Sequence, residues 1–199
     1  MEFKYQIYER RDILDEKNLI AELNMKNPDA LEELMTTYGT RLLKSAFLIL
    51  KDYGLAQDAV QEAFIQAYYK ISLFREQCTL YTWIYSIMLN ICRKKLRSNW
   101  LRKIVLTDEK MNTKLIGEEI NISHMDLQDS LQKLNDKYRR IAIMFYFEDF
   151  SIREIAEITG SREGTIKSSL NRLRGLLKDD MLGGNEYDEF SESRQTNEI

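Results

Sequence analysis

A single proline, Pro28, occurs in this chain of 199 residues, and its isolation limits what the chain can fold into more than any other feature. Proline is the strongest helix breaker, and glycine, the next strongest, occurs only eight times. Even Pro28 favours helix, because it follows Asn27, and this pair is a typical helix start. The sequence therefore predicts an all-α protein.

Three stretches within residues 28–98 have apolar side chains at helical spacing. The first begins at Asn27 and is expected to end near Gly54, the second covers 56–71, and the third covers 79–97. Each stretch places its apolar residues on one side, so three such helices can bury them against one another. We predict that residues 28–98 form one small helical domain.

The chain beyond this domain divides into three parts. After Asn99 the periodicity fades and charged residues, Asn, Thr and Gly117 appear, as in a connector, and helical spacing resumes at Leu127. We predict a flexible linker over 99–126, a second small helical domain over 127–178 and an acidic flexible tail over 179–199, while residues 1–27 form an N-terminal extension that is either helical or mobile.

The charge of the chain is unevenly distributed. The whole chain carries a net charge of −3, but residues 179–199 hold seven acids and one arginine, so the rest carries +3. The longest apolar run, 141–147, is far shorter than a membrane span, and the N-terminal residues are charged rather than apolar. We therefore expect a cytoplasmic protein without membrane insertion.

The residues that usually carry enzyme chemistry are sparse. Cys78, Cys92 and the single histidine, His124, do not have the spacing of a zinc site. The sequence also lacks a glycine-rich phosphate loop and a nucleophile near a histidine. We expect no enzyme activity, no catalytic residue, no metal and no cofactor.

Residues 151–177 read SIREIAEITGSREGTIKSSLNRLRGLL and have the pattern of a helix-turn-helix. Ser151 and Glu154 form a capping box that starts a helix, and Gly160 suits the left-handed turn that ends it. In the next helix, the apolar stripe consists of Ile166, Leu170, Leu173 and Leu177. The second domain is thus expected to end in two short helices joined at a glycine.

The opposite face of the last helix is small, polar and basic. It presents Gly164, Ser168, Asn171 and Arg172, flanked by Lys167 and Arg174 on one side and by Thr165 and Ser169 on the other. Helices that enter a DNA groove combine base-edge donors with phosphate-binding cations in this way. The alternative is a plain helical hairpin with a solvated face.

Two other faces indicate interactions in the first domain. The second helix exposes acids together with apolar groups, Asp58, Gln61, Glu62, Ile65 and Tyr69, as in a protein-docking face, although an ordinary surface has a similar composition. The third helix has a polar stripe, Ser86, Asn90, Arg93 and Arg97, and ends in the run RKKLRSNWLRK, which has six positive charges and no acid. Such a helix end is suited to phosphates.

The loop before the third helix, within FREQCTLYTW, has the aromatic and polar composition that can hold an unstacked base. Trp83, however, lies in the apolar stripe of the helix and is expected to be structural.

Taken in order, three segments resemble an RNA polymerase sigma factor of the extracytoplasmic-function (ECF) class. DAVQEAFIQAYYKI looks like the helix with which this family binds core polymerase, and FREQCTLYTWIYSIMLNICRKKLR looks like its −10 recognition segment. YRRIAIMFYFEDFSIREIAEITGSREGTIKSSLNRLRGLL looks like its −35 reader. The resemblance covers residues 30–98 and 127–178, with the segments in the order and spacing of the family.

The resemblance implies a protein that binds core RNA polymerase, recognises the −10 and −35 promoter elements and promotes melting of the duplex. Its implied partners are core polymerase, double-stranded promoter DNA, the melted non-template strand and an anti-sigma protein. Together with the faces described above, it gives three sets of site residues. Polymerase binding is expected from Asp58, Gln61, Glu62 and Ile65; −10 binding from Phe74, Arg75, Glu76, Gln77, Cys78, Thr79, Leu80, Ser86, Asn90, Arg93 and Arg97; −35 binding from Arg162, Thr165, Lys167, Ser168, Asn171, Arg172 and Arg174.

The sequence departs from the family pattern at positions that affect promoter choice. The base-capturing loop reads REQCT where a glycine is common, and Ser169 stands where an arginine is usual. Arg162 occupies the position of a frequent capping serine, so Ser161 is the expected cap of the last helix. The target promoter therefore cannot be copied from a relative.

Two other classes of protein remain as alternatives. A dimeric helix-turn-helix repressor or activator explains the second domain, but it leaves the exposed face of 56–71 and the basic third helix without a role. An enzyme is the weaker alternative. The sigma-factor interpretation is sterically feasible, because the 29 residues 99–127 extend to at most about 100 Å, and two turns of duplex measure about 70 Å.

Overall fold

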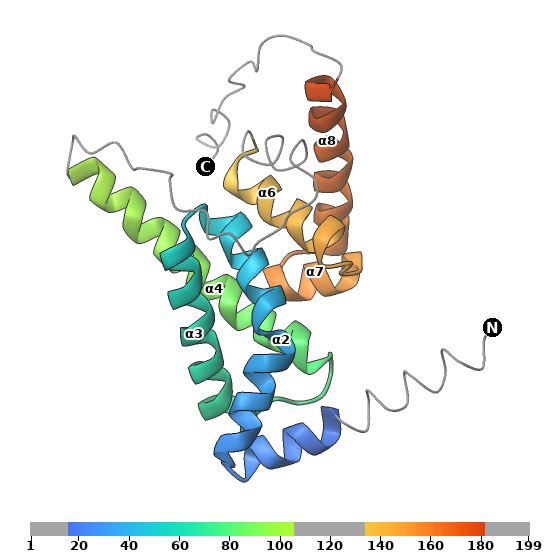
Figure 1. Ribbon diagram of the computed structural model, residues 1–199. Helices are drawn as coiled ribbons and strands as arrows, with labels where there is room; N and C mark the ends of the chain where they lie inside the picture. Colours follow the sequence, from blue (N-terminus) through green and yellow to red (C-terminus); the bar gives the residue numbers. More distant parts are fainter. Residues whose placement is uncertain (1–15, 106–133, 182–199) are drawn as a thin grey trace, which may run out of the picture.

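The computed structural model describes residues 16–105 and 134–181, and every regular element in these ranges is a helix, which confirms the predicted fold class (Figure 1). The elements are a helix at 16–24, α2 (Pro28–Leu50), α3 (Tyr53–Lys70), the 3₁₀ turn η1 (Ile71–Leu73), α4 (Leu80–Val105), α6 (Asp136–Ala142), the π-helical turn η2 (Ile143–Phe147), α7 (Ile152–Thr159) and α8 (Glu163–Met181). We call the elements up to residue 105 the N-terminal bundle and those from residue 136 the C-terminal bundle.

Local sequence signals fix most of the helix starts. Asn27 accepts a hydrogen bond from the Asp29 N–H at 3.1 Å, with Pro28 in the first turn, as predicted. The reciprocal bonds of the Ser151 and Glu154 capping box are both present at the start of α7. Gly160, with φ of 67°, provides the left-handed turn at its end.

Two helix ends differ from the prediction. α2 ends at Leu50 instead of near Gly54, because Lys51 turns left-handed and Asp52 caps α3 by accepting from the Leu55 N–H at 2.8 Å. α4 runs to Val105, so the first residues of the predicted linker, 99–105, are its last turns. The remainder of that linker and most of the acidic tail lie outside the described residues.

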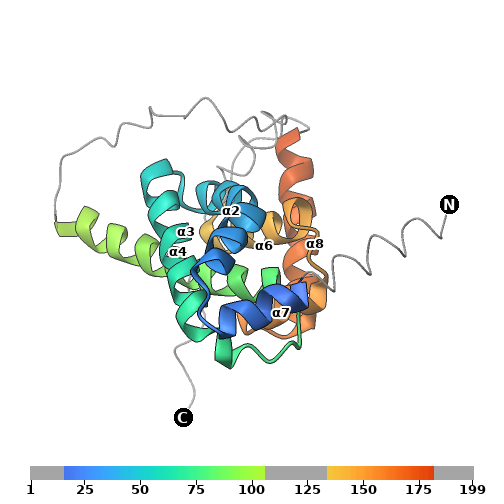
Figure 2. The same ribbon diagram turned by 60° about the horizontal axis from the view of Figure 1, so that its bottom comes forward.

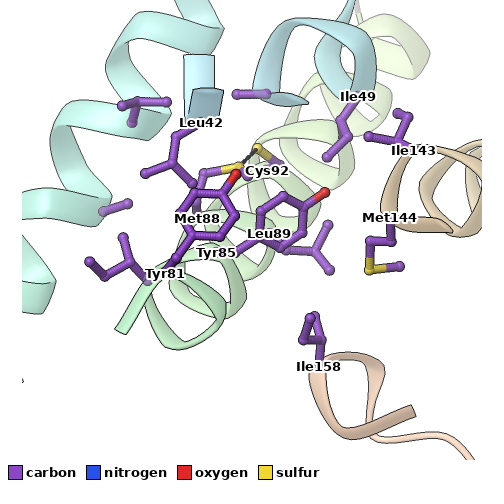
Figure 3. Packing of buried hydrophobic residues seen from close by; sticks show 14 of the residues in the cluster. Leu42, Ile49, Tyr81, Tyr85, Met88, Leu89, Cys92, Ile143, Met144 and Ile158 are labelled. Carbon is purple, nitrogen blue, oxygen red and sulfur yellow. Dashed lines mark hydrogen bonds between the residues drawn. The ribbon is translucent and has the colours of Figure 1, made fainter. Parts of the chain in front are cut away.

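In the N-terminal bundle, α2 packs against both α3 and α4. α3 contributes small residues and Phe64 to this contact, so the backbones can approach closely. α4 contributes large ones, and Tyr85, Met88 and Leu89 are at most 1% exposed. Figure 3 shows these three side chains beside Leu42 of α2. The apolar stripes of α2, α3 and α4 thus meet in one core.

The helix at 16–24 resolves part of the open question about the N-terminal extension. Leu19, Ile20 and Leu23 are buried against the bundle, so this segment belongs to the fold. Glu16 accepts a hydrogen bond from the Leu80 N–H at 2.9 Å, at the first turn of α4. Its carboxylate satisfies an otherwise unpaired donor and lies at the positive end of the α4 dipole.

The two bundles share one continuous core in this structure. Figure 3 shows Ile143 and Met144 of η2 and Ile158 of α7 facing Ile49 and Leu89 of the N-terminal bundle, and all five are buried. In Figures 1 and 2, α3 lies on one side of α2, and α6 and α8 lie on the other. The sequence predicted two helical units but not that they pack together.

Replacement of Glu16 tests the contact between the N-terminal helix and α4. Glu16→Ala removes the acceptor at the start of α4, so we expect the free energy of unfolding to fall by about 0.5–2 kcal/mol, as for loss of a helix cap. Urea denaturation measures this change. Lys17→Ala, an exposed neighbour on the same helix, is the control, and equal losses in both variants would show that the carboxylate is not the cause.

Candidate nucleic-acid and polymerase interfaces

The exposed face of α3 changes character along its length. Asp58, Gln61 and Glu62 are exposed near its start, while Ile65 is 47% and Tyr69 is 72% exposed further along. Leu73, in the following 3₁₀ turn, is 68% exposed and extends the apolar part. Large apolar side chains that remain in solvent on an otherwise well-packed helix are typical of a protein-docking surface. The residues predicted to bind polymerase therefore share one accessible face.

The loop before α4 is anchored by an aromatic contact. Phe74 is half-buried and packs on Trp83, with ring centroids 5.2 Å apart. This contact agrees with the structural role predicted for Trp83. Arg75, Glu76 and Gln77, by contrast, are exposed at the tip of the loop.

Glu76 has a φ of 54°, in the left-handed region that glycine occupies most easily. The left-handed turn at this residue gives a physical reason why a glycine is common in this loop in the family that the chain resembles.

The prediction that Leu80 contacts the −10 element is wrong. Its side chain is fully buried, and its N–H is bonded to Glu16. It begins α4, where the helical period turns it toward the core, so its side chain packs inside the bundle and is not available to contact DNA. Thr79 remains exposed beside it, and Cys78 is half-buried.

The polar stripe of α4 lies at the surface. Asn90, Arg93 and Arg97 are exposed, one turn apart along the helix. Ser86 is half-buried, and its hydroxyl donates to the Trp83 carbonyl at 2.7 Å. Three of the four predicted residues are therefore free to reach outward, while Ser86 is tied to its own helix.

The outward face of α8 is polar and exposed, as the helical period predicted. All seven predicted −35 residues are exposed: Arg162, Thr165, Lys167, Ser168, Asn171, Arg172 and Arg174. Ile166, Leu170 and Leu173 are buried on the opposite side. α8 begins at Glu163, so Arg162, and not Ser161, occupies the capping position.

Ser169 is the exception on α8. The helical pattern placed it at the edge of the outward face, but it is only 5% exposed. The reason is that this side of α8 is covered by α6 and lies near α4.

Glu148, which was not predicted as a functional residue, is a buried acid whose carboxylate accepts three side-chain hydrogen bonds. It is 3% exposed and directly follows η2. Its Oε2 accepts from Arg41 Nε and from the Tyr81 hydroxyl, both at 2.7 Å, and its Oε1 accepts from the Ser45 hydroxyl. Arg41 also donates to the Glu148 carbonyl at 2.8 Å. A carboxylate of the C-terminal bundle is thus held by α2 and α4 together.

Aromatic rings surround this carboxylate. The Arg41 guanidinium lies 4.3 Å from the Tyr81 ring centroid, and Phe150 packs edge-on against Tyr85 at 4.9 Å. Burial raises the pKa of both tyrosines, and the charge of Glu148 raises it further. The shift favours the protonated phenol, which is also the form of an ordinary tyrosine at neutral pH, so Tyr81 can donate to the carboxylate. The run FYFEDF contained the signal, an acid among aromatic residues.

Further contacts connect the bundles on either side of Glu148. The Thr82 hydroxyl donates to Glu154 of α7 at 3.4 Å, and Arg139 of α6 donates to the Ile49 carbonyl at 3.3 Å. Burial and the carboxylates of Glu157, Glu154 and Glu16 raise the pKa of the Cys78 thiol. The negative charges of α7 thus reach the loop predicted to bind DNA.

The described ranges contain no cluster of His, Cys, Asp and Glu that would hold a metal ion. None of the helices in 16–105 and 134–181 has the length and hydropathy to cross a bilayer.

The sequence of this chain is similar to those of known proteins. The family model of Sigma-70 region 2 matches residues 34–102, and that of Sigma-70 region 4 matches residues 124–177. The RNA polymerase sigma factor SigV of Bacillus subtilis is 32% identical over 145 residues, which are 72% of this chain and 86% of SigV. The ECF RNA polymerase sigma factor SigW of the same organism is 28% identical over 176 residues, 81% of this chain and 94% of SigW.

The chain belongs to the ECF class of RNA polymerase sigma factors. It acts in promoter recognition and transcription initiation. The two matched regions contain every residue that the sequence predicted for polymerase, −10 and −35 binding.

Solved structures show that the fold is also that of sigma factors. RpoE of Bartonella quintana, in complex with the anti-sigma factor NepR, superposes with a TM-score of 0.63 at 22% identity, over 78% of this sigma factor and 98% of RpoE. CnrH, in complex with the cytosolic domain of CnrY, gives a TM-score of 0.62 at 18% identity, over 85% and 99%.

Replacement of Glu148 tests whether its carboxylate holds the two bundles of the sigma factor together. Glu148→Gln keeps the size of the side chain but removes the charge that pairs with Arg41. We expect the free energy of unfolding to fall by about 1–3 kcal/mol, the cost of leaving buried polar partners unsatisfied, and the radius of gyration to rise as the bundles separate. Urea denaturation and small-angle X-ray scattering measure the two effects. Glu157→Gln, an exposed acid of α7, is the matched control; a compact Glu148→Gln variant of full stability would contradict the expectation.

Proposed function

We propose that this sigma factor binds core RNA polymerase through the exposed face of α3, holds the −10 element with α4 and the loop at 74–79, and reads the −35 element with α8. The observation that carries the proposal is the recognition face of α8, whose seven predicted residues are all exposed opposite a buried apolar stripe. The arrangement suits a groove, because short polar groups lie between cations that can bind phosphates on either side.

The closed arrangement must open for promoter binding. Arg93 of α4 and Thr165 of α8 line one pocket, so the two DNA-binding helices lie close together. The two promoter elements are about 70 Å apart, two turns of duplex, while the 19 residues of α8 measure only about 28 Å. Both elements can be bound at once only if the bundles separate, and the 21 predicted linker residues beyond α4, 106–126, can still extend to at most about 75 Å.

Melting of the −10 element is part of the proposal. Capture of an unstacked base by an aromatic platform returns about 1–3 kcal/mol, close to the few kcal/mol that flipping costs. The exposed tip Arg75 to Gln77, next to the Phe74 and Trp83 pair that anchors the loop, is the part of this loop open to such a base. Contacts with polymerase must supply the rest of the energy.

We infer that an anti-sigma protein is a further partner. RpoE and CnrH, which share the fold, are bound to NepR and to the cytosolic domain of CnrY in their structures. A partner that covers Ile65, Tyr69 and Leu73 would compete with polymerase for the same face.

The protein works in the cytoplasm, where polymerase and DNA are, and it contributes specificity while polymerase performs the chemistry.

A dimeric helix-turn-helix regulator, the alternative that the sequence left open, would require neither polymerase binding by α3 nor a basic α4. Run-off transcription with purified core polymerase separates the two. The sigma factor alone should direct core polymerase to start at a defined promoter, whereas a regulator gives no new start site.

Charge reversal on α3 tests the polymerase face. Asp58 is exposed and makes no side-chain bond within the described residues, so Asp58→Lys changes the face without disturbing the fold. We expect at least tenfold weaker binding to core polymerase, about 1.4 kcal/mol, with unchanged stability. Glu33→Lys, the same charge change on an exposed position of α2, is the control. Equal affinity of both variants for core polymerase would show that Asp58 is not part of the interface.

Truncation of Arg172 tests the mode of −35 recognition. If the guanidinium contacts a base edge, Arg172→Ala should cost about 1–3 kcal/mol at one base position and relax specificity there. Run-off transcription on a set of −35 sequences measures this loss. Arg153→Ala, an exposed arginine of α7, is the control. A uniform loss across all sequences would make Arg172 a phosphate contact instead.

A further inference from the structure

A pocket of about 190 Å³ lies between the two bundles, where α4, α6 and α8 meet. It is lined by three cations, Arg93, Lys137 and Arg140, by four hydroxyl residues, Thr159, Ser161, Thr165 and Ser169, and by the apolar residues Leu89, Ile141, Met144 and Ile166. No acid lines it. The pocket therefore combines concentrated positive charge with hydroxyl donors in a partly enclosed space.

The positive charges in this pocket are poorly compensated. Desolvation and the neighbouring charge of Arg93 lower the pKa of Arg140. Asp136 acts in the opposite direction, but its carboxylate is paired with Arg139. Neither Arg93 nor Arg140 forms an ion pair within the described residues. Two guanidinium groups thus face a shared space in which the described residues place no anion between them.

Ser169 provides an independent observation. It is 5% exposed, lines the pocket and forms no side-chain hydrogen bond with any residue in 16–105 or 134–181. Its hydroxyl is not among the fully buried atoms that lack a partner, so it is open to the pocket and can donate to a ligand there. Hydroxyl and guanidinium donors together are the groups that bind phosphate oxygens.

We propose that this pocket binds a small free phosphate or diphosphate anion, which Arg93 of α4, Arg140 of α6 and Ser169 of α8 hold together. The volume suits such a ligand, because 190 Å³ corresponds to about six waters at roughly 30 Å³ each. Lys137, exposed at the rim, adds a third cation. The anion joins both bundles, so it stabilises the closed arrangement.

The anion connects this pocket to the proposed function. Arg93 belongs to the predicted −10 face, and Thr165 belongs to the predicted −35 face. A ligand that binds only the closed form shifts the population toward it. This consequence rests on the proposed function: because promoter binding needs the open form, the anion opposes promoter binding.

Isothermal titration calorimetry with sodium diphosphate, at ionic strength matched with sodium chloride, tests the site on the full chain. We expect saturable binding of one anion, weakened at least tenfold in Arg140→Gln and in Ser169→Ala. Arg153→Gln makes the same charge change on an exposed position of α7 and should bind like the wild type. Circular dichroism verifies folding, and Lys137→Gln, at an exposed position, is the substitute should Arg140→Gln unfold.

Two further measurements separate this site from DNA binding. Diphosphate should slow amide hydrogen exchange at 148–150, which joins the bundles, in the wild type but not in Arg140→Gln. Neither experiment involves polymerase, so either can fail while the proposed function holds. Heat that does not saturate, or equal affinity in all variants, would overturn the proposal. So would an Arg140→Gln variant that loses affinity for a short DNA duplex and keeps it for diphosphate.

Discussion

The carboxylate of Glu148 carries a negative charge into a nearly dry site between two helical bundles, and the arrangement of those bundles depends on how that charge is satisfied. A buried charge costs several kcal/mol unless it is paired and hydrogen-bonded. Its donors, Arg41 and Ser45 on α2 and Tyr81 on α4, belong to the other bundle. Apolar contacts such as those of Phe150 add attraction without direction, whereas these bonds fix the orientation and bring α8 close to α4.

An interface of this kind is suited to opening. When apolar surfaces separate, water opposes the change, but a carboxylate and a guanidinium regain hydration when they part. Arg41 is already half exposed, with 51% of its side chain accessible, whereas Glu148 is almost entirely buried, so water reaches only the arginine of the pair. On the proposed function, polymerase and DNA open the closed form with the binding energy that they supply, and an ion pair with one partner already half exposed suits such opening.

The sequence predicted the elements well where a local signal controls them, and less well where a distant contact does. The capping box at Ser151 and the left-handed turn at Gly160 depend on a few neighbouring residues, and both were confirmed. Leu80 and Ser169 were misplaced for different reasons. The resemblance assigned Leu80 to −10 binding with the rest of its loop, although the helical period turns it toward the core. For Ser169, helical geometry gave the direction of the side chain but not which neighbouring helices cover it, and here α6 and α4 enclose it. Glu148 was missed because its donors lie more than 65 residues away along the chain.

The amino-acid sequence by itself determined that this protein is helical, where most of its helices begin, and which faces of α3 and α8 are polar, because caps and amphipathic periods act over one or two turns. It also carried the motifs that place the chain among sigma factors. Only the tertiary structure decided that the two bundles pack together, that Glu148 is buried between them, and that cations of α4 and α6 meet a buried serine of α8. Those outcomes depend on side chains far apart in sequence, and no local pattern encodes the distance between them.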